Sequence, residues 1–241
     1  MHDSIVIIPT YNEIDNIEAI IRAVFALEQR FDILIVDDNS PDGTAEKVRE
    51  LQSVFPDRLF MENRKEKSGL GTAYVHGFRW AIQHQYAYIF EMDADFSHNP
   101  NDLERLYKAC HEEGADVAIG SRYITGVNVV NWPLNRVLMS YFASVYVRMI
   151  TGVEIRDATA GFMCYRREVL EKIRLERIRF IGYAFQIEMK YRAFAAGFRI
   201  TEVPIIFTDR AKGQSKMSGS IIKEAIVGVI SLRLRKMFRR L

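Results

Sequence analysis

The chain has 241 residues, of which 49% are hydrophobic and 27% are charged, and this size suits one large globular domain. Its formal net charge of +2 excludes the strongly basic balance that is typical of nucleic-acid-binding proteins. The two cysteines, Cys110 and Cys164, have no metal-ligand spacing, which favours reduced core thiols over a disulfide framework.

The N-terminal residues contain a short apolar run without a basic segment before it, so no signal peptide is predicted. No apolar stretch approaches the roughly 20 residues that a membrane-spanning helix needs. We therefore expect a cytoplasmic protein, in which any contact with a membrane is peripheral.

The first half of the chain alternates short apolar runs with longer helical patterns. Apolar runs that predict strands occupy residues 4–9, 32–38, 58–63, 87–93 and 116–121. Helical spacing of apolar residues follows the first three runs, over 14–28, 40–55 and 69–85. The alternation predicts a single α/β domain of Rossmann-like type, with a mainly parallel central sheet flanked by helices and joined by right-handed crossovers.

The second half is less regular. Residues 131–150 predict an aromatic-rich helix without acidic residues, and 201–207 predict a further strand. A polar, glycine-containing loop follows at 209–220. The last segment, 221–241, is amphipathic and ends strongly basic, so we divide the chain into a domain over 1–220 and a C-terminal amphipathic helix over 221–241.

Polar residues follow three of the predicted strands, at Tyr11–Glu13, Asp37–Asp38 and Asp93–Asp95. In open α/β sheets, ligands bind beyond the carboxyl ends of the strands, so these residues are expected at one site. Mg²⁺ and Mn²⁺ prefer oxygen ligands and often complete their shells with substrate phosphates and water. Asp93 and Asp95 therefore predict a divalent metal site, the plain alternative being a solvated loop with an accidental D-x-D.

The glycine-rich segment 64–77 matches neither a P-loop nor a dinucleotide-binding fingerprint. We interpret it as a helix start that supports the neighbouring pocket. Arg122, Arg210 and Lys216 are candidate phosphate ligands, because arginine and lysine bind anionic oxygens. His98 is expected to support the aspartate pair from behind, and no nucleophile–histidine–acid set can be assembled.

The chain resembles the dolichyl-phosphate (polyprenyl-phosphate) mannosyltransferases, inverting GT-A glycosyltransferases of family 2. The resemblance runs from residue 5 to about 220 and is carried by IIPTYNE, VDDNSPDGT, GLGTAYVHG, MDADFSHNP, GSRY and EVPIIFTDRAKGQSK. It implies that residues 1–220 form the catalytic GT-A domain.

The resemblance also implies roles for individual residues. The donor nucleoside would be held by Pro9, Tyr11, Glu13, Val36 and Asp38. The metal and the donor diphosphate would be held by Asp93, Asp95 and the Ala94 backbone, with Ser97 as a further metal ligand at a position where some relatives have Gln. Catalysis would depend on Asp95 together with the phosphate-binding Arg122, Arg210 and Lys216.

The activity implied is transfer of mannose from GDP-mannose to a polyprenyl monophosphate, with Mg²⁺ or Mn²⁺. A polyprenyl-phosphate glucosyltransferase that uses UDP-glucose is the alternative within the same fold. A receiver-like signalling domain is disfavoured, since Asn63 stands where its acceptor aspartate would be. A sugar nucleotidyltransferase is disfavoured as well, because the chain opens with IIPTYNE and not with a glycine-rich, Arg-containing loop.

The lipid acceptor makes a membrane surface the expected partner, with or without an anchoring protein, and nucleic acid is not expected. The helix 131–150 is typical of a membrane interface, although an ordinary core helix fits its pattern equally well. Five basic residues in 233–241 suit anionic lipid headgroups, the alternative being a solvated terminus.

Overall fold

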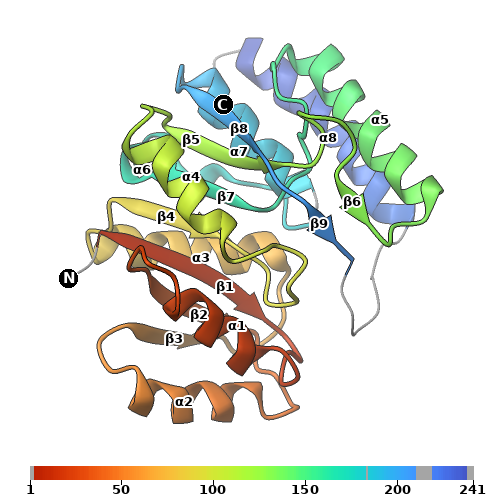
Figure 1. Ribbon diagram of the computed structural model, residues 1–241. Coiled ribbons are helices and arrows are strands. Elements are labelled where there is room, and N and C mark those ends of the chain that lie inside the picture. Colours follow the sequence, from red (N-terminus) through yellow and green to blue (C-terminus); the bar gives the residue numbers. More distant parts are fainter. Residues whose placement is uncertain (1–2, 183, 210–218, 238–241) are drawn as a thin grey trace.

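The computed structural model describes residues 3–182, 184–209 and 219–237. Its centre is a seven-stranded sheet with the strand order β3-β2-β1-β4-β7-β5-β8 (Figure 1). All neighbouring strands in this sheet run parallel except at β7, which is antiparallel to both β4 and β5. The prediction of a mainly parallel α/β sheet is therefore confirmed, while β7 was missed at the sequence level.

The strands of the central sheet are β1 (Ser4–Thr10), β2 (Asp32–Asp37), β3 (Leu59–Asn63), β4 (Tyr88–Glu91), β5 (Val117–Ser121), β7 (Met163–Arg166) and β8 (Ile200–Pro204). Every residue of β2, and all but Pro9 of β1, is buried, as expected for central parallel strands covered on both faces. Their apolar runs form strands because both sets of alternating side chains reach a core.

Helices cover both faces of this sheet. One face carries α1 (Ile17–Phe25), α2 (Thr44–Val54) and α4 (Asp102–His111), and the other carries α3 (Leu70–Gln83), α6 (Arg167–Lys172) and α7 (Ala184–Ala195). In α1, Ile17, Ile20, Ile21 and Val24 form the apolar stripe that faces the sheet. The structure thus has two hydrophobic layers, one on each side of the strands.

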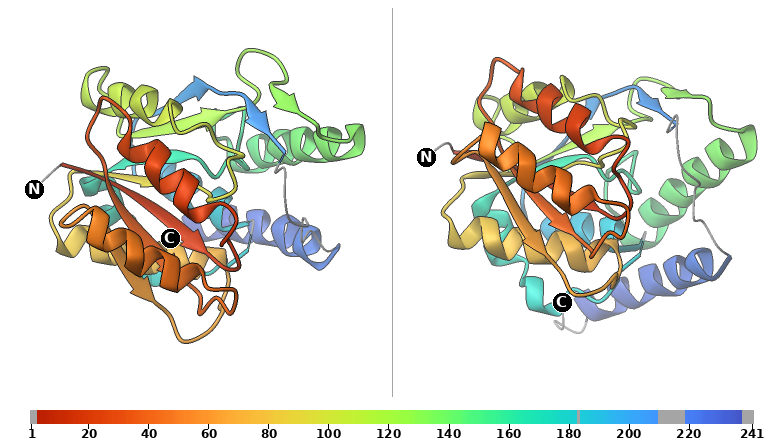
Figure 2. Two further views of the ribbon diagram at one scale, coloured as in Figure 1. Left: turned by 60° about the horizontal axis from the view of Figure 1, so that its bottom comes forward. Right: turned by 90° about the horizontal axis from the view of Figure 1, so that it is seen from below.

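A smaller unit lies beside the β5–β8 end of the sheet. It contains α5 (Leu134–Thr151), α8 (Gly219–Met237) and a two-stranded parallel sheet of β6 (Val129–Val130) and β9 (Phe207–Thr208). Figure 2 shows α5 and α8 together on the side of the molecule opposite the N-terminus. Helix α8 also packs on α7, so the division of the chain at residue 220 stays a prediction.

The strand predicted over 201–207 is wrong in one respect. Strand β8 ends at Pro204, which pairs with Ser121, and Phe207–Thr208 form the separate strand β9. Pro204 lacks an N–H for further pairing, and the chain crosses from one sheet to the other through Ile205 and Ile206. The Thr208 N–H donates to the Ser97 carbonyl at 3.3 Å, so residues 205–209 lie next to the segment that follows β4.

The predicted core thiols are confirmed, since Cys110 and Cys164 are both free and buried. Among the described residues, no helix is long and apolar enough to cross a bilayer.

Candidate active site

The carboxyl ends of β1 and β2 are joined through the carboxylate of Asp37. Its Oδ1 accepts hydrogen bonds from Thr10 Oγ1 at 2.8 Å and from Ser40 Oγ at 2.6 Å, and its Oδ2 accepts one from the Ser40 N–H at 2.8 Å. The Asn12 N–H donates to Ser40 Oγ at 3.0 Å, which links the next loop residue to the same group. Asp37 therefore shapes the two loops and does not face a ligand.

Both loops contain an asparagine in the left-handed region, Asn12 with φ 61° and Asn39 with φ 58°. Asparagine tolerates this conformation better than most residues other than glycine. These tight turns bring Tyr11 and Asp38 to neighbouring positions at the sheet edge, since Thr10 pairs with Asp37 in the sheet register.

Asp38 lies in a charged cluster with Tyr11, Arg64 and Lys67, which we call the Asp38 cluster. Its Oδ1 is 2.7 Å from Arg64 Nε, and Lys67 Nζ lies 4.0 Å from the centre of the Tyr11 ring. Burial raises the pKa of Asp38, although the charges of Arg64 and Lys67 oppose this shift. The Asp38 cluster combines an aromatic face, a carboxylate and two cations, which is a suitable set for a nucleotide.

The other residues predicted for the nucleoside lie on β1, on β2 and in the loop after β1. The Glu13 N–H donates to Thr44 Oγ1 at 3.0 Å, and Pro9 pairs with Val36 across β1 and β2. The Val36 side chain is fully enclosed in the core, so any ligand contact would use its backbone.

The segment after β4 bends from Ala94 to His98, and Phe96 has φ 59°. The strand ends at Glu91, so the alternation expected of an extended chain does not orient Asp93 and Asp95. Their surroundings do: Tyr74 Oη donates to Asp93 Oδ1 at 3.4 Å, and the Ser97 N–H donates to Asp95 Oδ1 at 3.0 Å. Two carboxylates are thus presented on a short bent loop that follows β4, the strand beside β1 in the sheet.

His98 is buried behind this loop. Its ring stacks on Phe162 with a centroid distance of 4.8 Å, and its Nδ1 accepts the Asp93 N–H at 3.3 Å. Burial lowers the pKa of His98 to about 4, although the charge of Asp95 opposes this shift. The imidazole is neutral at pH 7 and holds the backbone of Asp93, in agreement with the predicted supporting role.

The donor set fits a hard divalent cation that is shared with a substrate. Within the described ranges, no group of three or more His, Cys, Asp or Glu side chains could enclose a metal ion. Asp93 and Asp95 supply two carboxylates, and Mg²⁺ in particular is commonly held by one or two carboxylates together with phosphate oxygens and water. Ser97 is buried beside Asp95, and its role as a further ligand stays a prediction.

Arg122, directly after β5, is not a solvated side chain. Its Nε donates to Asp157 Oδ2 at 2.7 Å, and its Nη2 donates to Asp157 Oδ1 at 2.6 Å and to Thr159 Oγ1 at 2.8 Å. The Trp132 and Phe207 rings lie 5.2 and 5.6 Å from its guanidinium. Its predicted contact with phosphate stays a prediction, and the structure adds a fixed orientation.

Arg136 lies close to the same tryptophan. Its guanidinium is 4.1 Å from the Trp132 ring, and its Nη1 is 2.9 Å from Asp209 Oδ1. Two cations thus lie close to one indole, near the ion pair that joins α5 to Asp209. The predicted phosphate ligands Arg210 and Lys216 lie outside the described residues.

Behind the aspartate loop lies a buried polar cluster. Glu91 accepts hydrogen bonds from Tyr165 Oη at 2.9 Å and from the Gln186 amide, and Lys190 Nζ donates to the Ala160 carbonyl at 2.5 Å. Burial raises the pKa of Glu91 to about 7 and lowers that of Lys190 to about 8. This cluster ties the end of β4 to α7.

The glycine-rich segment leads into the start of α3, as predicted, and the structure adds a packing role for its glycines. A Cβ on Gly71 would lie 2.8 Å from the Phe185 ring and 2.9 Å from the Phe180 carbonyl, and one on Gly77 would lie 2.6 Å from Ile7. Because both positions lack a Cβ, α3 packs closely enough on β1 and α7 to bring Tyr74 to Asp93.

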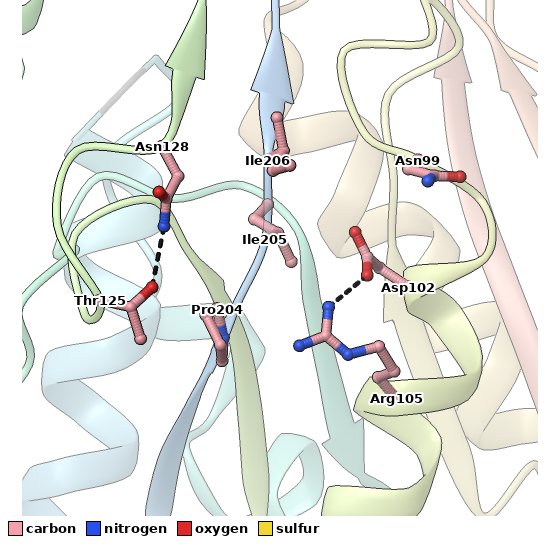
Figure 3. Close-up of a pocket in the computed structure, with 8 residues that line it drawn as sticks. All are labelled: Asn99, Asp102, Arg105, Thr125, Asn128, Pro204, Ile205 and Ile206. Atoms are coloured by element: carbon pink, nitrogen blue, oxygen red, sulfur yellow. Dashed lines mark hydrogen bonds and ion pairs between the residues drawn. The ribbon is translucent and has the colours of Figure 1, made fainter.

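A separate pocket of about 320 Å³ opens beside α4 (Figure 3). Figure 3 shows Asp102 and Arg105 joined on one side, and Asn128 joined to Thr125 on the other. Pro204, Ile205 and Ile206 form its apolar wall, and Asn99 completes it. None of the residues predicted for the active site lines this pocket.

Sequence reasoning missed Arg64, Lys67, Tyr74, Arg136 and Asp157 as members of the site. Arg64 directly follows β3, so the rule that found the other strand ends could have found it. Asp157 has no local signal, because its partner Arg122 is 35 residues away in the chain.

The family model "Glycosyl transferase family 2" matches residues 5–174. The chain is 49% identical over 232 residues to a polyprenol monophosphomannose synthase of Mycolicibacterium smegmatis, covering 96% of this chain and 87% of that protein. It is 43% identical over 223 residues to an undecaprenyl-phosphate mannosyltransferase of Micrococcus luteus, covering 92% of this chain and 90% of that protein.

Solved structures agree in fold at low sequence identity. A glucosyl-3-phosphoglycerate synthase of Mycobacterium tuberculosis, in complex with Mn²⁺, UDP and its product, has a TM-score of 0.67 at 17% identity, over 98% of this chain and 80% of that chain. A mannosyltransferase of Pyrobaculum calidifontis, in complex with GDP-Man and Mn²⁺, has a TM-score of 0.60 at 16% identity, over 99% and 72% of the two chains. The chain therefore belongs to glycosyl transferase family 2 and is a glycosyltransferase of the GT-A fold.

Proposed function

We propose that this enzyme transfers mannose from GDP-mannose to a polyprenyl monophosphate and inverts the configuration at the anomeric carbon. The observation that carries the proposal is the pair Asp93 and Asp95 on the bent loop after β4, at the same edge of the sheet as the Asp38 cluster. The names of the two relatives at 49% and 43% identity support the same sugar and the same class of acceptor.

The donor occupies the edge formed by β1, β2 and β4. Tyr11 offers a ring face to the nucleoside, and the Asp38 carboxylate accepts hydrogen bonds from it. Arg64 and Lys67 lie close enough to reduce the repulsion between this acidic edge and an anionic donor. The solved mannosyltransferase with GDP-Man supports a guanine donor.

Asp93 and Asp95 hold a divalent metal together with the donor diphosphate. When bound, the metal neutralises charge on the leaving diphosphate. His98 and Tyr74 keep the Asp93 backbone and carboxylate in place before the donor arrives. The described side chains fit either Mg²⁺ or Mn²⁺, since both prefer oxygen ligands.

The acceptor phosphate approaches from the α5 side, where the guanidinium groups of Arg122 and Arg136 both lie close to the Trp132 ring. A phosphate monoester has a second pKa near 6, so it is largely ionised at pH 7 and needs no general base. Catalysis then depends on placing two anionic groups in line and stabilising their charge.

A membrane surface presents the lipid acceptor to this side of the enzyme. Exposed apolar residues line one face of α5 (Leu134, Leu138, Tyr141, Phe142, Met149) and one face of α8 (Val227, Ile230, Leu234). We call these eight residues the α5–α8 apolar surface. Arg233, Arg235 and Lys236 follow in the last turns of α8, and such charges favour anionic headgroups.

The direct test is a transfer assay with purified protein, short-chain polyprenyl phosphate and either GDP-mannose or UDP-glucose, in Mg²⁺, Mn²⁺ or EDTA. Metal-dependent formation of mannosyl lipid from GDP-mannose is the expected result. Transfer from UDP-glucose alone would overturn the donor and leave the mechanism standing. Transfer that persists in EDTA at full rate would overturn the metal assignment.

A further inference from the structure

Arg122 is held by a relay of two acids, the partly buried Glu202 on the edge strand of the central sheet and the fully buried Asp157. Glu202, on β8, accepts the Asp157 N–H at 2.9 Å and Ser121 Oγ–H at 2.7 Å with Oε1, and the Arg156 N–H at 2.8 Å with Oε2. Asp157 in turn forms a bidentate pair with Arg122. Glu202 thus fixes the backbone that presents Asp157.

The pair leaves Arg122 little freedom. The Asp157 side chain is 0% exposed and that of Arg122 is 8% exposed, and Asp157 Oδ2 also accepts the Arg122 backbone N–H at 3.0 Å. Thr159 accepts from Nη2 at 2.8 Å, and the Tyr123, Trp132 and Phe207 rings surround the guanidinium. Backbone and side chain of one arginine are therefore clamped by the same carboxylate.

Stability alone does not account for this arrangement. A buried ion pair loses much of its Coulomb energy to desolvation. Apolar residues of similar volume in its place often give the protein equal or greater stability. What the carboxylate adds is direction, because the bidentate geometry fixes the guanidinium plane. Arg122 directly follows β5, so its guanidinium is fixed at the sheet edge where the proposed reaction takes place.

Resting on the proposed function, we propose that Asp157 is a positioning residue of the transfer reaction, which orients Arg122 toward the acceptor phosphate, and that Glu202 sets Asp157. Asp157 itself touches no substrate. Its loss should therefore weaken the use of the acceptor while binding of the donor nucleotide is maintained.

The chain offers a matched control. Glu188 and Arg192 on α7 form a second buried pair at 2.8 Å, with exposures of 0% and 3%, and Glu188 also accepts two backbone N–H groups of the preceding loop, from Arg179 and Phe180. It shares no residue with the Arg122 relay. Glu188→Gln removes one charge of a buried pair in the same way as Asp157→Asn.

The experiment compares wild type, D157N and E188Q for steady-state transfer from GDP-mannose with the polyprenyl phosphate varied, and for binding of GDP with Mn²⁺. D157N should lower kcat/KM for the acceptor by about 10- to 100-fold, the usual effect of losing an orienting partner. GDP affinity should stay within about twofold, and E188Q should leave acceptor kcat/KM within about threefold.

A double variant separates positioning from general damage. If Asp157 acts through Arg122, D157N should change kcat/KM of the R122K enzyme by less than about threefold, because the interaction is already lost. Should D157N not fold, Thr159→Val removes a single acceptor of Nη2 and should lower acceptor kcat/KM in the same direction.

The outcomes separate the two levels of inference. Wild type without transfer to any polyprenyl phosphate would overturn the proposed function. If wild type is active, two results would overturn the positioning role alone. One is a folded D157N variant with unchanged acceptor kinetics, and the other is an E188Q variant that is impaired as much as D157N.

Discussion

Thr10 Oγ1 donates to Asp37 Oδ1 at 2.8 Å, and this bond joins the ends of two neighbouring parallel strands in the core of the molecule. The adjacent aspartate, Asp38, pairs with Arg64, which directly follows β3. Two consecutive acids thus have different surroundings, Asp37 within the fold and Asp38 at the site where we propose that the donor nucleoside binds.

The two acids should respond differently to the same substitution. Asp37→Asn should lower the free energy of unfolding by about 2 to 4 kcal/mol, since buried hydrogen bonds to a charged group are lost. Asp38→Asn should cost about 1 kcal/mol or less, because burial already disfavours its charge, and should weaken GDP binding about tenfold. Urea unfolding and nucleotide titration measure both effects, and equal loss of stability would contradict the division.

Replacing the second aspartate of the bent loop should abolish metal dependence. Asp95→Asn should lower transfer by at least about 100-fold and weaken Mn²⁺-dependent GDP binding, since the metal loses a charged ligand. Asp102→Asn, on α4 beside the pocket of Figure 3, is the control and should leave both unchanged. Isothermal titration with and without Mn²⁺ gives the comparison, and equal effects of the two variants would contradict the assignment.

The close packing of α3 can be tested with single methyl groups. Gly71→Ala would place a Cβ 2.8 Å from the Phe185 ring, and overpacking of this kind costs about 1 to 3 kcal/mol. Activity should fall as well, because α3 carries Tyr74 to Asp93. A Cβ added by Gly182→Ala would meet no atom within 4 Å, so this control should leave the stability unchanged. Thermal unfolding of the two variants is the measurement, and similar melting temperatures would argue against tight packing.

The α5–α8 apolar surface should bind lipid. Phe142→Glu changes a side chain that is 60% exposed, and should weaken binding to vesicles with anionic lipid about tenfold or more. The control is Val54→Glu on α2, 56% exposed and outside this surface, which should bind as wild type. Vesicle cosedimentation tests both, and parallel losses would assign the binding to net charge alone.

Acid should reduce the stability difference between wild type and D157N. Burial tends to raise the pKa of Asp157, but the Arg122 charge and hydrogen bonds outweigh it and hold that pKa below its ordinary 3.8. Stability from this pair is therefore present above pH 3.8 and is lost as pH falls through the folded-state pKa.

At pH 7, D157N should lose about 3 to 5 kcal/mol, because a buried guanidinium is left without its carboxylate. The gap should shrink between pH 4 and pH 3. Denaturant unfolding at pH 7, 4 and 3 measures it, and a gap that is constant over this range would contradict the pairing.

The rule that ligands bind beyond the carboxyl ends of strands predicted several residues of the candidate site, and their roles stay a prediction. Asp38, Asp93 and Asp95 follow buried strands, and the register of β1, β2 and β4 brings them to one edge. Sequence reasoning failed at β7, because an antiparallel strand inside a parallel sheet has no local pattern that distinguishes it. It also failed for the strand over 201–207, where the break after Pro204 depends on a second sheet.

Local sequence determined the elements and the chemistry of this protein. Apolar runs and helical periodicity define strands and helices through neighbours in the chain, and the residue types at strand ends restrict the ligands they can hold. Tertiary structure alone decided which groups meet. Asp37, and not Asp38, forms the hydrogen bond that joins the ends of β1 and β2. Arg122 is held by an acid 35 residues away in the chain. Helix α5 has an exposed apolar face. These outcomes depend on long-range packing and burial, which no short window of sequence contains.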